Sequence, residues 1–263
     1  RVGKALEDAA KDKKVKAIVL RIDSGGGSYV ASDTIRRAVE QARAKGKPVV
    51  VSMGNAAASG GYYVALAAER IVAEPATITG SIGVFAGKLY TAEAWRKLGV
   101  NWDAVAGGAR ADLWTQSHDY SEDERAWLAG TLDRIYDDFV GRVAEARKLT
   151  VDRARELAKG RVWTGAEAKR LGLVDELGGL DDAIASARSL AKLQPDAKTV
   201  IREFPRSRSF PRRLIDRLTG KDEDDAPALG TLEAQFEPLV ALARQLGVLD
   251  SPGVLSMPPI SIR

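Results

Sequence analysis

The feature that most constrains the fold is a strand, a glycine-rich turn, a helix and a second strand between residues 15 and 53. Residues 15–23 (VKAIVLRID) are apolar and rich in β-branched side chains, which predicts a buried strand, and residues 25–27 are all glycine. An amphipathic helix is predicted over 30–44 and a second strand over 49–53. Two strands joined through a helix run parallel, so we expect a parallel sheet covered by helices.

The same alternation continues before the pattern becomes helical. Short strands are predicted at 70–73, 82–85 and 102–105, and helices at 2–14, 59–68, 91–98, 121–147, 150–158, 164–171 and 180–193. A capping box, Ser121 with Glu124, marks the start of the longest helix. We therefore predict an α/β domain of repeated βαβ units over 1–193. Residues 194–263 are predicted to be a C-terminal extension, a linker with one amphipathic helix at 232–246.

Composition and charge exclude several classes of function. The chain has no cysteine, which excludes disulfides, thiolate metal ligands and a cysteine nucleophile. Forty basic and 36 acidic residues give a formal net charge of +4, so bulk charge does not support nucleic acid as a partner. Basic residues cluster at 202–217, which we interpret as a solvated linker; contact with anionic phospholipid head groups is the alternative.

Neither a membrane span nor a leader is visible in the sequence. The longest weakly polar run, residues 56–68, is shorter than the roughly 20 apolar residues that a spanning helix needs. The chain opens at Arg1 with no methionine and no charged-then-apolar leader. We therefore expect it to be an internal piece of a longer protein.

Two glycine clusters follow predicted strands, at the edge where open parallel sheets bind ligands. Neither residues 25–27 nor residues 57–63 (AASGGYY) match a phosphate-binding loop or the dinucleotide fingerprint. The second cluster places Ser59 at the first turn of a helix, where free N–H groups would stabilise an oxyanion. Gly27 and Gly60 are the candidate N–H donors. The alternative is a close packing site that simply needs small side chains.

A serine nucleophile needs a base, and few residues here can serve. The single histidine, His118, lies in a polar segment that is typical of a surface loop. A lysine would have to be largely buried, because lowering its pKa from about 10.4 to about 7 means destabilising the ammonium by roughly 4 to 5 kcal/mol. Lys88 follows an apolar segment and is the one lysine near the predicted sheet; a surface position is its alternative.

Several segments together resemble the signal peptide peptidase A family. They are KAIVLRIDSGGGS at 16–28, VVSMG through AASGGYY at 50–63, TGSIG at 79–83, and GRVWTG with GLVDELG within 160–178. The resemblance covers most of residues 4–193. It implies a Clp-protease/crotonase-like fold and a serine–lysine peptidase that degrades cleaved signal peptides and other short apolar peptides. No cofactor and no metal are expected.

The resemblance also assigns roles to particular residues. Ser59 matches the family's nucleophile, and Ser81 matches the serine that orients the lysine. Gly27 and Gly60 match the oxyanion-hole donors. Gly25 stands where the family usually has a proline, which should loosen the turn without removing its N–H groups.

One family residue is missing. Ala111 occupies the position that carries the general-base lysine in the short bacterial forms, and Arg110 cannot replace it because a guanidinium stays protonated in proteins. Long forms contain two copies of the fold, the C-terminal copy supplying the serine and the N-terminal copy the lysine. This chain resembles that C-terminal copy, so by itself we expect it to be inactive.

The resemblance implies partners and a location as well. The partners are the N-terminal half of the same protein, further copies in a homo-oligomer such as a tetramer, and peptide substrates. The location is the bacterial cytoplasmic membrane, reached through an N-terminal anchor outside this chain, with the catalytic domain on the periplasmic or outer side.

Other functions stay open at this point. One is a catalytically inactive homologue or an oligomerising scaffold half. Another is a crotonase-type acyl-CoA enzyme, which would need a carboxylate base and no serine at the helix start. A histidine-dependent Clp-type peptidase would place its base near Val84, where there is no histidine.

Overall fold

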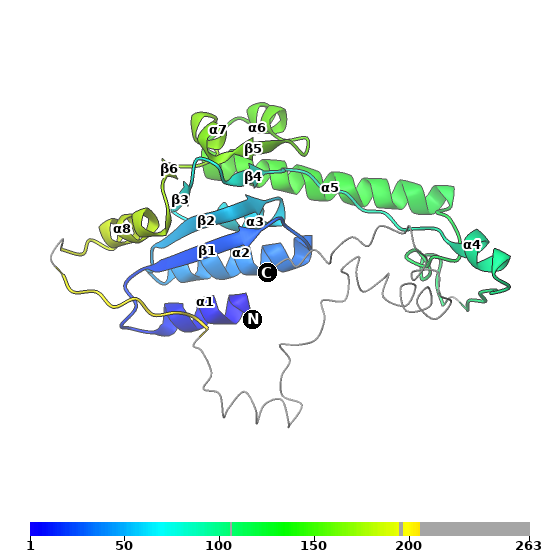
Figure 1. Ribbon diagram of the computed structural model, residues 1–263, viewed down its shortest axis with the longest axis horizontal. Helices are drawn as coiled ribbons and strands as arrows, with labels where there is room; N and C mark the ends of the chain where they lie inside the picture. The colour runs from blue at the N-terminus through cyan, green and yellow to red at the C-terminus, as the bar shows by residue number, and fades with distance from the viewer. Residues whose placement is uncertain (106, 195–196, 206–263) are drawn as a thin grey trace, which may run out of the picture. The chain divides into compact units, whose positions relative to one another are not determined.

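The computed structural model of the chain describes residues 1–105, 107–194 and 197–205. Its elements, labelled in Figure 1, are α1 (Val2–Lys11), β1 (Ile18–Ser24), α2 (Tyr29–Ala44), β2 (Val49–Ala58), α3 (Gly60–Ala65), β3 (Arg70–Ala73), β4 (Ile78–Gly80), α4 (Ala92–Lys97), α5 (Glu122–Arg147), α6 (Val151–Leu157), β5 (Val162–Thr164), α7 (Gly165–Arg170), β6 (Glu176–Leu177) and α8 (Leu180–Leu190). Among these residues, no helix combines the length and the apolar character needed to cross a membrane.

Strand β2 organises the sheet, because three other strands pair with it. Along one side it pairs in parallel with β1; along the other, its first half pairs with β3 and its last residues pair with β4, both in parallel. β6 extends the sheet in parallel beside β3, and β5 pairs antiparallel with β4. The predicted α/β class, a mostly parallel sheet covered by helices, is confirmed (Figure 1).

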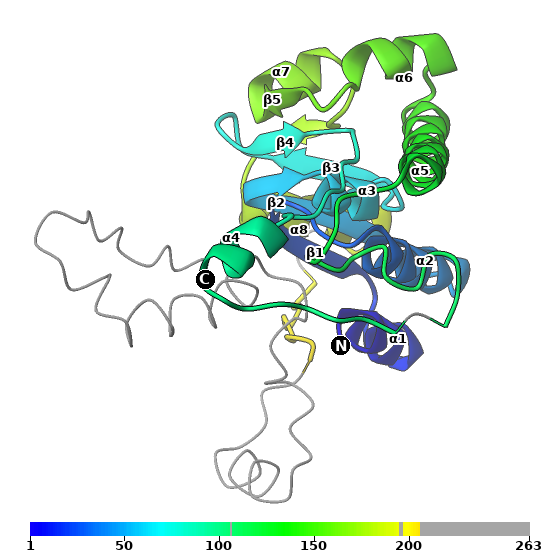
Figure 2. The same cartoon turned by 90° about the vertical axis from the view of Figure 1, so that its right-hand side faces the viewer.

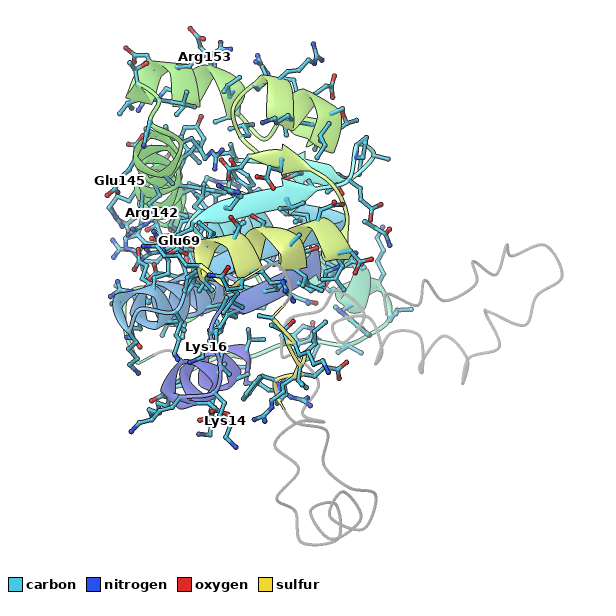
Figure 3. All side chains as sticks on the ribbon, turned by 90° about the vertical axis from the view of Figure 1, so that its left-hand side faces the viewer. Lys14, Lys16, Glu69, Arg142, Glu145 and Arg153 are labelled. Atoms are coloured by element: carbon cyan, nitrogen blue, oxygen red, sulfur yellow. The ribbon has the colours of Figure 1, made fainter. Side chains whose placement is uncertain are left out.

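The two faces of the sheet are covered by different helices. Val50 and Val72 pack against α8, which lies across one face (Figure 3). Val51, Met53 and Ile71, which alternate with them along β2 and β3, belong to the large core around α3 and α5. The buried α3 packs against both α2 and α5, and Figure 2 shows these two longer helices on the same side of the sheet.

An irregularity in the pairing of β1 with β2 brings the two glycine clusters together. Ile22 pairs with Met53, but Ser24 pairs with Ala57, so β2 carries extra residues at this point. The Asp23 carboxylate accepts a hydrogen bond from the Ala56 N–H (3.1 Å) inside the irregularity. Such bulges bend a strand and redirect its end, and the end of β2 leads into the second glycine cluster.

Several predicted elements need correction. Residues 82–85 and 102–105 form no strand; the Phe85 and Val105 side chains are 96% and 103% exposed, so nothing covers them as a sheet would require. The strand expected at 82–85 is β4, which ends at Gly80. β5 and β6 were missed because strands of three and two residues carry no periodicity. The helix predicted at 59–68 is shorter, Gly60–Ala65.

Residues after the predicted domain end at 193 continue to pack on the fold. Phe204 contacts the cluster that contains Leu6 and Val49, and Arg202 lies 3.5 Å from the Asp12 carboxylate. The division between 193 and 194 stays a prediction. Most of the basic segment 202–217 and the helix predicted at 232–246 lie outside the described residues.

Candidate active site

Ser59 lies at the junction of β2 and α3, in a strained backbone conformation. Its φ of 49° and ψ of −118° fall where residues with a Cβ are rarely found, and such strain concentrates at functional sites. Its N–H donates to the Gly80 carbonyl (2.8 Å), and its own carbonyl accepts from Tyr63 N–H (2.8 Å) in the first turn of α3. Within the part of the chain that the structure describes, the half-buried Ser59 hydroxyl has no hydrogen-bond partner.

The first glycine cluster packs directly against Ser59 and Gly60. A Cβ added at Gly26 would lie 2.7 Å from the Ser59 Cβ and 2.9 Å from the Gly60 nitrogen, so only glycine fits. A Cβ added at Gly60 would overlap the Ser32 hydroxyl and lie 3.3 Å from the Gly27 nitrogen. The two glycine clusters therefore pack against each other next to Ser59, and the role of Gly27 and Gly60 as N–H donors stays a prediction.

Ser81 follows β4 in the same way that Ser59 follows β2. Ala58 and Gly80 are register partners in these parallel strands, so the two serines leave the sheet at the same level. Ser81 has a φ of 48°, close to that of Ser59, and its N–H donates to the Arg161 carbonyl (2.7 Å). The structure thus brings the two predicted serines together at the carboxyl edge of the sheet.

Serine side chains hold the first glycine cluster in place. The Ser24 hydroxyl accepts from the Gly26 N–H (3.2 Å), and the Ser28 hydroxyl caps α2 by accepting from the Ala31 N–H (3.4 Å). The buried Ser32 hydroxyl donates to the Ser28 carbonyl (3.0 Å) and lies against Gly60. Sequence reasoning missed Ser32; its place one helical turn after the N-cap of α2 was the available signal.

The candidate bases are occupied elsewhere. The Lys88 Nζ is buried 4.4 Å from the centroid of the Tyr120 ring, without a hydrogen-bond partner among the described residues. The Lys88 residue is half-buried in an otherwise exposed segment, and the contact of its ammonium is with the Tyr120 ring. The His118 ring nitrogens lie 2.6 Å from the Asp119 carbonyl and 2.9 Å from the Asp112 carboxylate. Ala111 is exposed in the turns that precede α5.

One cluster in the described ranges has the composition of a metal site. Asp112, His118 and Glu124 each place one ligand atom within 4.8 Å of the others. These atoms already satisfy one another and the backbone, because Asp112 bonds to His118 and Glu124 accepts from the Ser121 N–H (2.7 Å) in the capping box of α5. We therefore assign no ion to it.

Comparisons with known proteins connect this geometry to chemistry. Residues 41–194 match the model of Peptidase family S49. The chain is 47% identical over 190 residues to "Protease 4" of Salmonella typhi, which covers 72% of this chain and 30% of that protein. It is 39% identical over 208 residues to "Serine protease SPPA, chloroplastic" of Arabidopsis thaliana, covering 78% of this chain and 31% of that protein.

A third relative is closer to this chain in length. "Putative protease slr0021" of Synechocystis is 39% identical over 219 residues, covering 83% of this chain and 76% of that protein. The chain therefore spans about 30% of the first two relatives and most of the third. Among solved structures, a point mutant of ClpP1 from Listeria monocytogenes matches with a TM-score of 0.45 and 19% identity over 69% of this chain and 88% of that one, a likeness too weak to bear on function.

Proposed function

The chain belongs to Peptidase family S49, and from this premise we propose that it is the nucleophile-bearing part of a serine endopeptidase that degrades cleaved signal peptides and other short apolar peptides. The observation that carries the proposal is the meeting of the two glycine clusters. Gly26 packs on Ser59 and Gly60 so closely that no side chain fits there, and a Cβ at Gly60 would lie 3.3 Å from the Gly27 nitrogen.

The proposed reaction uses these groups in sequence. The Ser59 hydroxyl attacks the carbonyl carbon of the peptide bond and transfers its proton to a neutral lysine amine. The carbonyl oxygen becomes an oxyanion, which accepts hydrogen bonds from the Gly27 and Gly60 N–H groups. When the C–N bond breaks, the lysine returns the proton to the leaving amine. Water, activated by the same lysine, then hydrolyses the ester on Ser59.

We propose that this lysine comes from an N-terminal copy of the fold in the full-length protein. Support comes from Ala111 at the family's lysine position and from the unpartnered Ser59 hydroxyl, which no base of the described chain reaches. Ser81, beside Ser59 at the sheet edge, would accept a hydrogen bond from the lysine N–H and so hold the lysine lone pair toward Ser59.

Replacing Ser81 with alanine should lower the rate of peptide cleavage by the full-length protein about 10- to 1,000-fold, the range for loss of an orienting group in general-base catalysis. Ser189→Ala, an exposed change on α8, is the matched control and should leave kcat unchanged. Steady-state kinetics across pH decide the outcome. A Ser81→Ala enzyme with the wild-type rate and pH profile would make Ser81 a turn residue only.

Replacing Gly26 with alanine should remove most activity, because the new Cβ would lie 2.7 Å from the Ser59 Cβ and would occupy a φ of +117°. Gly25→Ala is the matched control one residue away; its Cβ meets nothing within 4 Å, so activity should stay near that of the wild type. The readout is the rate of covalent labelling of the full-length protein by a fluorophosphonate. Equal labelling rates for the two variants would contradict the proposed contact between the clusters.

A catalytically inactive homologue is the second candidate function, and Ala111 is the observation that favours it. Such a protein would keep the peptide-binding edge but would not cleave. Peptide hydrolysis by the purified full-length protein, dependent on Ser59, separates the two candidates.

Exposed apolar side chains support the proposed assembly. Between β4 and α5 the chain runs out along α5 to α4, away from the sheet (Figure 1). Phe85, Leu98, Trp102 and Trp114 of this segment are each 56% exposed or more. Large apolar side chains exposed on one segment are typical of protein interfaces, so we propose that this segment contacts the N-terminal half or another copy in a homo-oligomer. Location at the outer side of the bacterial cytoplasmic membrane is part of the same proposal.

A further inference from the structure

A single carboxylate oxygen joins three elements around the candidate site. Asp138 lies on α5, and its Oδ2 accepts hydrogen bonds from the Tyr29 hydroxyl (2.9 Å), the Tyr63 hydroxyl (2.8 Å) and the Arg142 Nε (2.8 Å). Arg142 lies one turn further along the same helix, so its charge is held beside the carboxylate. Asp138 takes no part in the proposed proton transfers.

The two tyrosines come from the elements that carry the two N–H donors. Tyr29 is the first residue of α2, directly after the loop that contains Gly27. Tyr63 lies one turn into α3, after Ser59 and Gly60, and is almost fully buried. Their rings meet edge to face with centroids 5.5 Å apart. Asp138 therefore bonds to both halves of the site at once.

The backbone pairing of β1 with β2 ends at Ser24 and Ala57, just before the glycines of the two clusters. Among the described residues, no hydrogen bond joins residues 25–28 to residues 59–63; the contacts there are close packing. The side-chain links between α2 and α3 include the packing of Ser32 against Gly60, a longer hydrogen bond from the Tyr63 hydroxyl to Asp33 (3.3 Å), and the two bonds to Asp138. The bonds to Asp138 connect α2 and α3 through a third element, α5.

The protonation states suit this role. Burial raises the pKa of Asp138, but the hydrogen bonds from Arg142, Tyr63 and Tyr29 outweigh it, so the pKa lies below its usual value. Burial and the bond to Asp138 raise the pKa of Tyr63. At neutral pH the carboxylate is therefore ionised and the hydroxyl is protonated, which makes Tyr63 a donor and Asp138 an acceptor in a charge-assisted bond.

We propose that Asp138 is a positioning residue that holds the Gly27 and Gly60 N–H groups at the separation an oxyanion requires. The inference rests on the proposed function, because it assigns Asp138 a purpose in that same site. Misplacement by about 1 Å of groups that contact a transition state can lower a rate about 100-fold. Asp138 does this through the hydroxyls of Tyr29 and Tyr63, without touching the substrate.

The test compares Asp138→Asn with Asp137→Asn in the full-length protein. Asp137 is the neighbouring residue on α5, exposed and paired with Arg155 (3.1 Å), so its variant controls for loss of a carboxylate from this helix. We expect Asp138→Asn to lower kcat about 10- to 100-fold with KM within about twofold of wild type. The affinity for a peptide aldehyde, whose adduct on Ser59 places an oxygen between the donors, should fall by a similar factor. Asp137→Asn should match the wild type in kcat, in KM and in affinity for the peptide aldehyde.

Tyr29→Phe and Tyr63→Phe are milder variants that decide the matter if Asp138→Asn does not fold. Each should lower kcat, and the double variant should lose no more than Asp138→Asn, because both hydroxyls act through one carboxylate. Thermal unfolding measures the folded fraction of each variant. A loss of kcat that a smaller folded fraction fully explains would overturn the proposal. So would wild-type kcat and aldehyde affinity in the Tyr29→Phe and Tyr63→Phe enzymes. A wild-type protein that neither cleaves peptides nor labels at Ser59 would instead refute the proposed function.

Discussion

Replacing Ser59 with alanine is expected to abolish peptide cleavage by the full-length protein while leaving its fold intact. Removal of a serine nucleophile lowers kcat by a factor on the order of 10⁶. The fold should tolerate the change because the hydroxyl has no hydrogen-bond partner among the described residues, so its loss leaves no buried group unsatisfied. Alanine also carries a Cβ, so the strained φ of 49° is no harder to adopt than for serine.

Hydrolysis of a fluorogenic apolar peptide measures the loss of cleavage, and thermal unfolding measures whether the fold is intact. The unfolding midpoint of Ser59→Ala should lie close to that of the wild type. Turnover that persists in a folded Ser59→Ala protein would show that another residue is the nucleophile.

The 263-residue chain, purified alone, is expected to hydrolyse peptides at or near the uncatalysed rate. In the proposed mechanism Ser59, Ser81 and the glycine nitrogens are present in this chain, but the general base is not, because the family resemblance places its lysine at Ala111. Loss of a general base lowers a rate typically 100- to 10,000-fold. Adding the N-terminal part of the full-length protein as a separate polypeptide should restore cleavage, and mutation of the lysine it supplies should remove the activity again.

An active isolated chain would contradict this half-site model. Lys88→Ala and His118→Ala would then identify the base. The structure makes His118 the weaker of the two, since both of its ring nitrogens are already engaged by Asp119 and Asp112.

The first half of the fold could be predicted because its signals are local. The apolar run of β1, the glycine turn and the periodic pattern of α2 lie next to one another in the sequence, and the predicted strand and helix ends match within a few residues. Ser59 could be placed at the start of α3 for the same reason. The relation of Ser81 to Ser59 was available only through the family resemblance, because it depends on the pairing of β2 with β4.

The features that could not be predicted depend on long-range contacts or on where a strand stops. The apolar run after Ser81 suggested a strand at 82–85, yet the positive φ values at Gly80 and Ser81 end β4 before it. Asp138 gave no signal, since its partners Tyr29 and Tyr63 lie 109 and 75 residues away. Periodicity reports which face of an element is buried, and it does not report which polar group that face meets.

The most direct test of Ser59 as the nucleophile is to map the site of fluorophosphonate modification by mass spectrometry of the full-length protein. We predict a single adduct on the peptide that contains Ser59, absent from Ser59→Ala and formed more slowly in Gly26→Ala than in Gly25→Ala. An adduct on a different residue, or complete inhibition of peptide cleavage without an adduct at Ser59, would contradict this assignment.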